Sequence, residues 1–209
     1  MRLEPTDILL VIDVQNDFCP GGALAVAGGD QVIKPIHRIA QHFRHVLLTQ
    51  DWHPAGHSSF ASSHPGRKPF EQVEMPYGPQ TLWPEHCKQQ TPGAEFHPAL
   101  HLPQAELILR KGFRPEVDSY SAFFENDHTT PTGLAGYLKE RGLVRVFFAG
   151  LAYDYCVGYS ALDARRLGLP AFILRDATRP IDRNGSVAAI ETEFARSGVE
   201  LIESTALSA

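Results

Sequence analysis

Short apolar runs alternate with amphipathic stretches along this chain. Six of the runs are continuous and rich in branched side chains, which is typical of strands covered on both faces of a parallel sheet. They predict strands at residues 7–13, 45–51, 106–111, 144–150, 170–176 and, more weakly, 199–202. The chain shows no internal repeat and no low-complexity tract, so the strands belong to an ordinary globular fold.

The amphipathic stretches between these runs predict four helices. In the first, at residues 30–43, Val32, Ile36, Ile39 and Phe43 recur at helical spacing. Cap and glycine signals place the others at residues 133–141, with Thr132 as N-cap and Gly142 beyond the end, from Cys156 to Gly168, and from about Gly185 to Gly198. Alternating strands and helices with right-handed crossovers predict a three-layer α/β/α sandwich around a mostly parallel, doubly wound, six-stranded sheet.

Residues 52–104 break this rhythm. They show no convincing periodicity and contain many Pro, His and Gly residues. A stretch of this length without regular structure is usually functional or disordered, and its histidines favour function. We therefore expect one domain, residues 1–209, that carries a long metal- and substrate-binding loop insert at about residues 52–104.

Composition and charge narrow the class of protein. The chain has 209 residues, 43% of them hydrophobic, and a net charge of -5 with both signs mixed along its length. That balance gives no basic stripe for a nucleic acid, and the apolar run near the N-terminus is too short for a signal sequence or a membrane span. We expect a cytoplasmic protein that acts on a small molecule, without a nucleic-acid or membrane partner, and leave a homo-oligomer open. Three widely spaced cysteines exclude a disulfide framework.

Polar residues follow three of the predicted strands at their carboxyl ends, where open parallel sheets bind ligands. Asp13, Lys111 and Cys156 supply a carboxylate, a cation and a nucleophile. Singly, each is more often structural, because such residues commonly cap turns, face solvent or pack in cores. Their occurrence at one edge of the sheet favours a catalytic Cys-Asp-Lys triad.

The turn before Cys156 is expected to assist the sulfur. A helix that begins at Cys156 would direct its positive dipole end at the thiol and favour thiolate. The amides of Ala152 and Cys156 are candidates for an oxyanion hole. Of the other cysteines, Cys19 is expected to be partly exposed in a turn and Cys87 to be packed, both without a catalytic role.

A second group of polar residues follows the strand at residues 45–51. On an extended segment Asp51 and His53 project to the same side, so that both reach one ion, and a third ligand would come from His57 or His86. Carboxylate and imidazole donors suit zinc, iron or manganese. Among ten histidines the Asp-x-His spacing is a weak signal. Two histidines and a carboxylate also describe the site of a non-haem iron oxygenase, which stays open as a remote alternative.

Several segments together resemble a known family. The stretches "LLVIDVQNDFCPGGALAV", "TQDWHPAGHSSFAS", "TLWPEHC", "KGFRPEVDSYSAFF" and "GLAYDYCVGYSALDA" look like the nicotinamidase/pyrazinamidase branch of the isochorismatase-like cysteine hydrolases, in order and over nearly the whole chain. The resemblance implies an amidohydrolase that converts nicotinamide to nicotinate and ammonia in NAD salvage and also accepts pyrazinamide. A sister amidase that acts on a carbamoyl or ureido substrate is the alternative.

The resemblance also implies roles for individual residues. The triad corresponds to Asp13, Lys111 and Cys156, and the oxyanion amides to Ala152 and Cys156. One divalent ion, zinc or iron, with manganese as a further option, is held at positions that match Asp51, His53 and His86, to which some members add a ligand from the loop around His57. The ring-binding positions map onto Phe18, Leu24, Trp83 and Tyr155. One departure is Tyr153, where the family more often has threonine, and this residue puts the fine substrate preference in doubt.

Overall fold

Five parallel ladders join six strands into one sheet in the order β5-β2-β1-β6-β7-β8. The computed structural model describes residues 1–208. The strands are β1 (Asp7–Ile12), β2 (His45–Asp51), β5 (Leu107–Lys111), β6 (Arg145–Leu151), β7 (Ala171–Arg179) and β8 (Glu200–Ile202). All six predicted strands are thereby confirmed, and β7 runs beyond its predicted end at residue 176.

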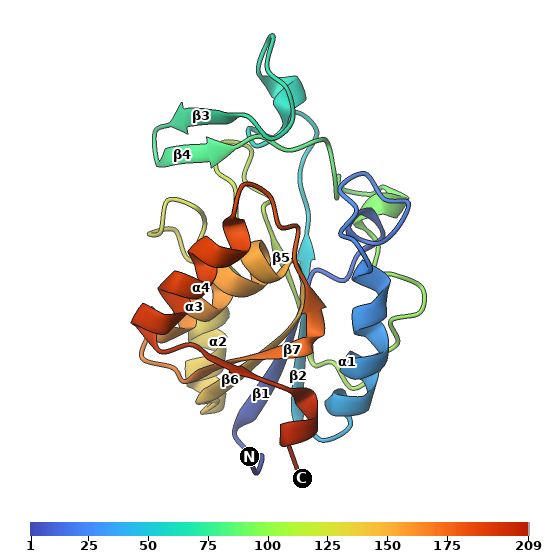
Figure 1. The fold of residues 1–209 in the computed structure, drawn as a ribbon, viewed down its shortest axis with the longest axis vertical. Coiled ribbons are helices and arrows are strands. Elements are labelled where there is room, and N and C mark those ends of the chain that lie inside the picture. The colour runs from blue at the N-terminus through green and yellow to red at the C-terminus, as the bar shows by residue number, and fades with distance from the viewer. Residues whose placement is uncertain (209) are drawn as a thin grey trace.

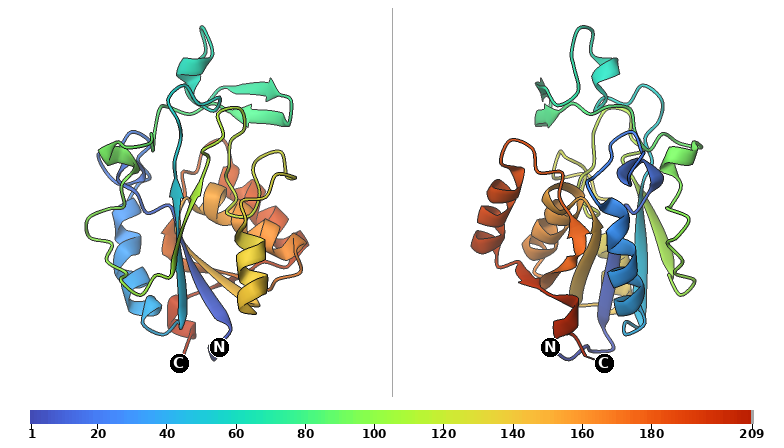
Figure 2. Two further views of the ribbon diagram at one scale, coloured as in Figure 1. Left: turned by 180° about the vertical axis from the view of Figure 1, so that it is seen from behind. Right: turned by 45° about the vertical axis from the view of Figure 1, so that its right-hand side comes forward.

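Helices cover both faces of this sheet. They are α1 (Ile33–Ala40), α2 (Leu134–Arg141), α3 (Gly158–Arg166) and α4 (Ser186–Ser197). Helix α1 lies on one face, whereas α2, α3 and α4 lie on the other, and the two termini come together at the end of the molecule opposite the long insert (Figures 1 and 2). The predicted three-layer α/β/α architecture is confirmed.

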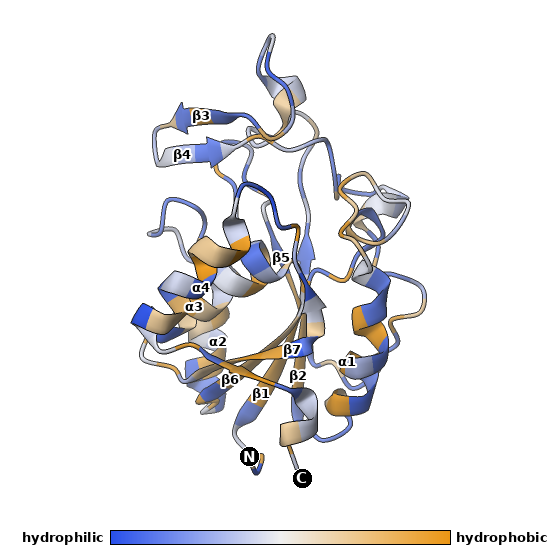
Figure 3. Ribbon diagram, in the orientation of Figure 1, coloured by the Kyte–Doolittle hydropathy of each residue, from blue (hydrophilic) through white to orange (hydrophobic). Residues whose placement is uncertain are grey.

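The alternation of side chains along each strand builds two hydrophobic cores. In β1, Leu9 and Val11 pack toward α1, and Ile8 and Leu10 pack toward the three helices on the other face. Successive strand residues point to opposite faces, so a strand covered on both sides has to be apolar throughout. Figure 3 shows this as continuous hydrophobic colour along the central strands.

Three predicted helices, α1, α2 and α3, begin later than the sequence suggested, and α3 begins at Gly158 in place of Cys156. Residues Gly29–Val32 form a 3-10 turn before α1, and the N-cap of α2 is Gly133 in place of Thr132. The Thr132 hydroxyl still accepts a hydrogen bond from the Leu134 amide at 3.2 Å. Gly133, with φ of 103°, occupies the N-cap position. Thr132 therefore lies one residue before the N-cap and still satisfies an amide of the first turn.

The insert contains regular structure that the sequence did not reveal. Strands β3 (Gln72–Met75) and β4 (Gly78–Thr81) form an antiparallel hairpin, which projects above the carboxyl ends of the main sheet (Figure 1). The prediction that residues 52–104 lack regular structure is therefore wrong for this segment. Within residues 1–208, no helix combines the length and the apolar character needed to cross a bilayer.

Candidate active site and metal centre

The carboxyl ends of β1, β5 and β6 bring the three predicted triad residues together. Asp13 follows β1 with φ of 46°, a conformation that aspartate tolerates better than most residues. Lys111 ends β5, and Cys156 lies in the turn after β6. The Lys111 ammonium is 2.9 Å from Asp13 Oδ2 and 3.4 Å from Cys156 Sγ. The carboxylate, the cation and the thiol therefore meet at one point.

Lys111 is fully buried and has four polar partners. Besides Asp13 and Cys156, its ammonium donates to Asp51 Oδ1 at 2.6 Å and to the Ser119 carbonyl at 2.8 Å. Burial by itself would lower the pKa of Lys111, but Asp13 and Asp51 together hold it well above its ordinary value. The Lys111 ammonium thus lies between two carboxylates that favour its charged form.

Thr49 on β2 fixes the carboxylate of Asp13. Its hydroxyl donates a hydrogen bond to Asp13 Oδ1 at 2.6 Å and accepts one from the Asp13 amide at 3.1 Å. The other oxygen, Oδ2, is left facing Lys111. Burial raises the pKa of Asp13 above its ordinary value, and the contacts with Lys111 and Thr49 offset this only in part.

Cys156 lies in a π-helical turn, Tyr153–Val157, and α3 begins only at Gly158. Burial raises the pKa of the Cys156 thiol well above its ordinary value, Lys111 opposes this in part, and Asp13 adds to it. The expectation that a helix begins at Cys156 is therefore wrong, because α3 begins two residues later and Cys156, only 7% exposed, lies inside the turn. Burial therefore favours the neutral thiol, whereas the neighbouring Lys111 favours the thiolate.

A second cluster, formed by Asp51, His53 and His86, lies beside the triad. Their donor atoms lie within 4.8 Å of one another. Asp51 Oδ2 is 3.2 Å from His53 Nε2 and 3.7 Å from His86 Nε2. Burial alone would raise the pKa of Asp51, but Lys111 and His53 hold it well below its ordinary value.

Backbone carbonyls set the orientation of both imidazoles. His53 Nδ1 lies 2.8 Å from the Gly112 carbonyl, and His86 Nδ1 lies 2.8 Å from the Pro84 carbonyl. Because a carbonyl only accepts, each Nδ1 carries a proton, and in the neutral imidazole each Nε2 then presents a lone pair toward Asp51. Among residues 1–208 nothing donates to the buried His53 Nε2. Three electron-pair donors that face one another fit a divalent cation, and carboxylate with imidazole suits zinc, iron or manganese.

Gly112 makes this arrangement possible. It has φ of 64°, and a Cβ at this position would come within 2.5 Å of the His53 ring. Only glycine therefore lets the chain turn away from Lys111 while its carbonyl holds His53.

His57 lies next to this cluster without joining it. Its ring is 4.3 Å from that of His53, and its Nδ1 lies 2.8 Å from Ser59 Oγ. Its ring nitrogens group with His53 and Asp118, not with Asp51 and His86. Burial lowers the pKa of His57 to about 4. A role for His57 as a further metal ligand stays a prediction.

An aromatic pocket opens onto both clusters. It contains the four residues predicted to bind the ring, the two predicted oxyanion residues, two of the predicted metal ligands and three residues that the sequence did not indicate. The lining residues are Phe18, Leu24, Asp51, Trp83, His86, Asp118, Tyr120, Ala152, Tyr155, Cys156 and Ile181. The peptide bond between Leu151 and Ala152 is cis.

The remaining cysteines and Tyr153 lie away from this pocket. Cys19 is 2% exposed, so the expectation that it is partly exposed is wrong; burial, with Asp30 nearby, raises its pKa to about 11. Cys87 is fully buried, as expected. Tyr153 points toward α4, where its hydroxyl donates to Glu191 at 2.8 Å.

Comparison with known proteins places the chain in a family. Residues 7–206 match the isochorismatase domain. This protein belongs to the isochorismatase family. Two curated relatives are nicotinamidases: the one from Acinetobacter baylyi is 54% identical over 94% of this isochorismatase-family chain and 92% of its own, and the one from Escherichia coli is 42% identical over 85% of each.

Solved structures agree with this placement. A nicotinamidase/pyrazinamidase from Acinetobacter baumannii has a TM-score of 0.96 and 52% identity, covering 97% of this chain and 98% of its own. A protein from L. infantum, solved in complex with nicotinate, has a TM-score of 0.85 and 40% identity, covering 98% and 96%. A pyrazinamidase from Pyrococcus horikoshii, in complex with zinc, has a TM-score of 0.76 and 33% identity, covering 95% and 99%.

Three pocket residues of this isochorismatase-family protein were missed in the sequence. Asp118 and Tyr120 follow Lys111 in the loop after β5, and Ile181 follows β7. Their only signal was position beyond the carboxyl end of a strand. Asp118 is buried and accepts hydrogen bonds from Gln80 Nε2 and the Ser119 amide, each at 2.8 Å; only the folded insert brings Gln80 to it.

Proposed function

We propose that this protein is an amidohydrolase that converts nicotinamide to nicotinate and ammonia, accepts pyrazinamide, and serves NAD salvage in the cytoplasm. The observation that carries the proposal is the convergence of Cys156, Lys111 and Asp13 on the wall of a pocket lined by aromatic residues. The names of the relatives from Acinetobacter baylyi and Escherichia coli support the same activity.

In the first half of the reaction, Cys156 is the nucleophile and Asp13 is the base. Asp13 takes the thiol proton while the sulfur attacks the carboxamide carbon. The amides of Ala152 and Cys156 stabilise the oxyanion. Asp13 then gives the proton to the departing nitrogen, so ammonia leaves and a thioester remains.

In the second half, Asp13 takes a proton from water as the water oxygen attacks the thioester carbon. The carbon–sulfur bond breaks, the proton returns to the sulfur, and nicotinate is released. Lys111 transfers no proton in this scheme: Asp13 and Asp51 hold its pKa above the ordinary value, and Asp51 remains its ionised partner while Asp13 carries the proton. Its charge favours the ionised form of Asp13 before each attack.

Asp51, His53 and His86 would hold one divalent metal ion. Bound there, the ion would supply a Lewis acid that binds the ring nitrogen of the substrate and orients it. The zinc-bound relative from Pyrococcus horikoshii favours zinc, and the donor set also suits iron or manganese.

The pocket walls position the ring. Phe18, Leu24, Trp83 and Tyr155 provide apolar and aromatic surface, and Trp83 and Tyr155 pack edge to face with centroids 4.9 Å apart. A flat heteroaromatic ring between such walls would present its carboxamide to Cys156.

Ammonia release from nicotinamide by the purified protein tests the proposal. We expect turnover in the metal-loaded protein, a loss of turnover after chelation, and none in Cys156→Ala. Pyrazinamide and a carbamoyl substrate are assayed alongside. Turnover of the carbamoyl substrate alone would replace the proposal with the sister amidase, and a requirement for oxygen would replace it with the oxygenase. Activity in Cys156→Ala would refute the thioester.

A further inference from the structure

The aromatic pocket is narrower than its proposed substrate requires. The space inside it measures about 20 Å³, which is room for about one water molecule. A pyridine carboxamide is several times larger. Side chains in or around the pocket therefore have to move before a substrate reaches Cys156, and the residues that resist this movement influence which substrates enter.

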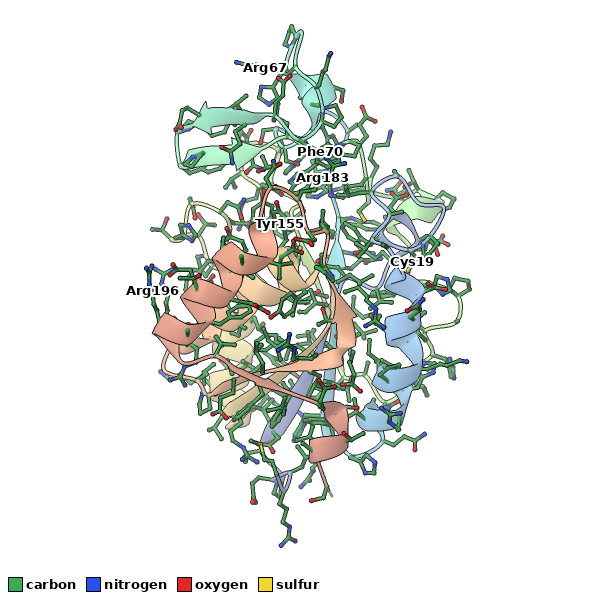
Figure 4. The ribbon with its side chains drawn as sticks, viewed as in Figure 1. Cys19, Arg67, Phe70, Tyr155, Arg183 and Arg196 are labelled. Carbon is green, nitrogen blue, oxygen red and sulfur yellow. The ribbon has the colours of Figure 1, made fainter. Side chains whose placement is uncertain are left out.

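Phe70 and Arg183 meet above the pocket. The guanidinium carbon of Arg183 lies 3.7 Å from the centroid of the Phe70 ring, and that ring packs edge-on against Trp83 of the pocket wall, with centroids 6.0 Å apart. Figure 4 shows the pair between the β3–β4 hairpin and the beginning of α4, with Tyr155 below it. Two segments far apart in sequence are thus joined by one cation–π contact.

The pair separates two open hollows. One, of about 510 Å³, is lined by Phe70 and Arg183 together with Gln72, Thr81, Tyr155, Asn184 and Ser186. The other, of about 320 Å³, is lined by the same pair together with Ala23, Leu24, Ala25, Val26, Ala27 and Ile181. Both hollows share wall residues with the inner pocket, Tyr155 on one side and Leu24 and Ile181 on the other. The Phe70–Arg183 pair therefore lies between two hollows, and both of these hollows border the inner pocket.

Hydrogen bonds hold the backbone on both sides of the Phe70–Arg183 pair. On one side, the buried Asp154 carboxylate accepts hydrogen bonds from the Ile181 and Asp182 amides, each at 2.9 Å, and from the Ser186 hydroxyl at 2.5 Å. On the other side, the Phe70 amide donates to the Leu82 carbonyl. The backbones are held, so opening involves mainly the two side chains, which are joined by a contact that is weak at exposed sites.

We propose that Phe70 and Arg183 form a size filter at the mouth of the pocket, which admits single-ring aromatic carboxamides and excludes fused-ring ones. The inference deepens the proposed function and rests on it for the substrate class. The filter acts on access, because neither side chain is among the residues that line the inner pocket in the described chain.

Substrate selectivity tests the filter. Wild type, Phe70→Ala and Arg183→Ala are compared with nicotinamide and quinoline-3-carboxamide. We expect the ratio of kcat/KM values to shift about tenfold toward the fused-ring substrate in both variants, the scale on which one pocket group discriminates. Arg196→Ala is the matched control, because Arg196 lies at the far end of α4 and pairs with Glu193 at 2.7 Å (Figure 4). An unchanged ratio in both variants overturns the filter.

Thiol alkylation gives a second measurement that needs no substrate. The rates at which iodoacetamide and a bulky N-aryl maleimide modify Cys156 are followed by peptide mass. We expect the maleimide rate to rise relative to the iodoacetamide rate in Phe70→Ala and Arg183→Ala, but not in Arg196→Ala. No ammonia from wild type together with a raised maleimide rate would remove the proposed function and keep the filter. Ammonia from wild type, with neither the kcat/KM ratio nor the alkylation-rate ratio changed in the variants, would keep the proposed function and overturn the filter.

Discussion

Replacing Thr49 with valine removes one hydroxyl next to the base and keeps the shape of the side chain. That hydroxyl makes a 2.6 Å hydrogen bond to Asp13 Oδ1 between two side chains that are both fully buried. Hydrogen bonds to charged groups contribute about 1.5–3 kcal/mol, and 1.36 kcal/mol corresponds to a tenfold change in rate. We therefore expect kcat to fall by about ten- to a hundredfold.

The effect falls on kcat because Thr49 does not line the pocket among the described residues, so KM for nicotinamide should change little. The pH profile shifts as well. Thr49 lowers the pKa of Asp13, against burial, which raises it. Without Thr49 that pKa rises further, a smaller fraction of Asp13 is ionised at a given pH, and the acid limb of kcat/KM moves to higher pH.

Ammonia release from nicotinamide at a series of pH values measures both effects. Thr49→Ser keeps the hydroxyl and is the matched control, which should retain most of kcat. Urea denaturation identifies any variant that is partly unfolded, because the valine also leaves the buried Asp13 amide without its acceptor. A folded Thr49→Val protein with the kcat and acid limb of wild type would refute the reasoning.

Three other substitutions test separate parts of the site. Lys111→Met should abolish turnover and lower the free energy of unfolding by about 3–5 kcal/mol, because it leaves Asp13 buried without its cation; urea denaturation would contradict this if stability were unchanged. His86→Asn should reduce the metal retained after dialysis, measured by atomic absorption, and equal retention would exclude His86 as a ligand. Tyr153→Phe should lower the free energy of unfolding by about 1 kcal/mol through the lost bond to Glu191 and leave kcat/KM unchanged; a changed substrate preference would return Tyr153 to the site.

The main sheet could be predicted because its signal is local. A strand covered on both faces must be apolar throughout, and the run at residues 45–51 coincides with β2. The sequence also predicted that Asp13, Lys111 and Cys156 share one edge of the sheet, because parallel strands present their carboxyl ends at one side.

The rest depends on contacts between distant segments. The β3–β4 hairpin carries few apolar residues, so no periodicity marks it. The helix start at Cys156 was misjudged because the π-helical turn Tyr153–Val157 precedes α3, and the burial that raises the pKa of Cys156 is not visible in a local sequence pattern. Tyr153 packs toward α4 because it contacts Glu191 and Phe194 there. These residues lie far from Tyr153 in the sequence, so no local pattern indicates the contact.

The triad and the metal cluster are one electrostatic unit, because both draw on the same cation. Lys111 lies between Asp13 and Asp51 at 2.9 and 2.6 Å. Two ionised carboxylates and one ammonium leave one negative charge in excess in a buried site, which is costly. A divalent ion at Asp51, His53 and His86 would compensate the Asp51 carboxylate, change the net charge of the site from negative to positive, and leave Lys111 to compensate Asp13. Chelation should therefore lower the melting temperature as well as turnover, and Asp51→Asn should shrink that decrease, because the substitution removes both the excess charge and a ligand.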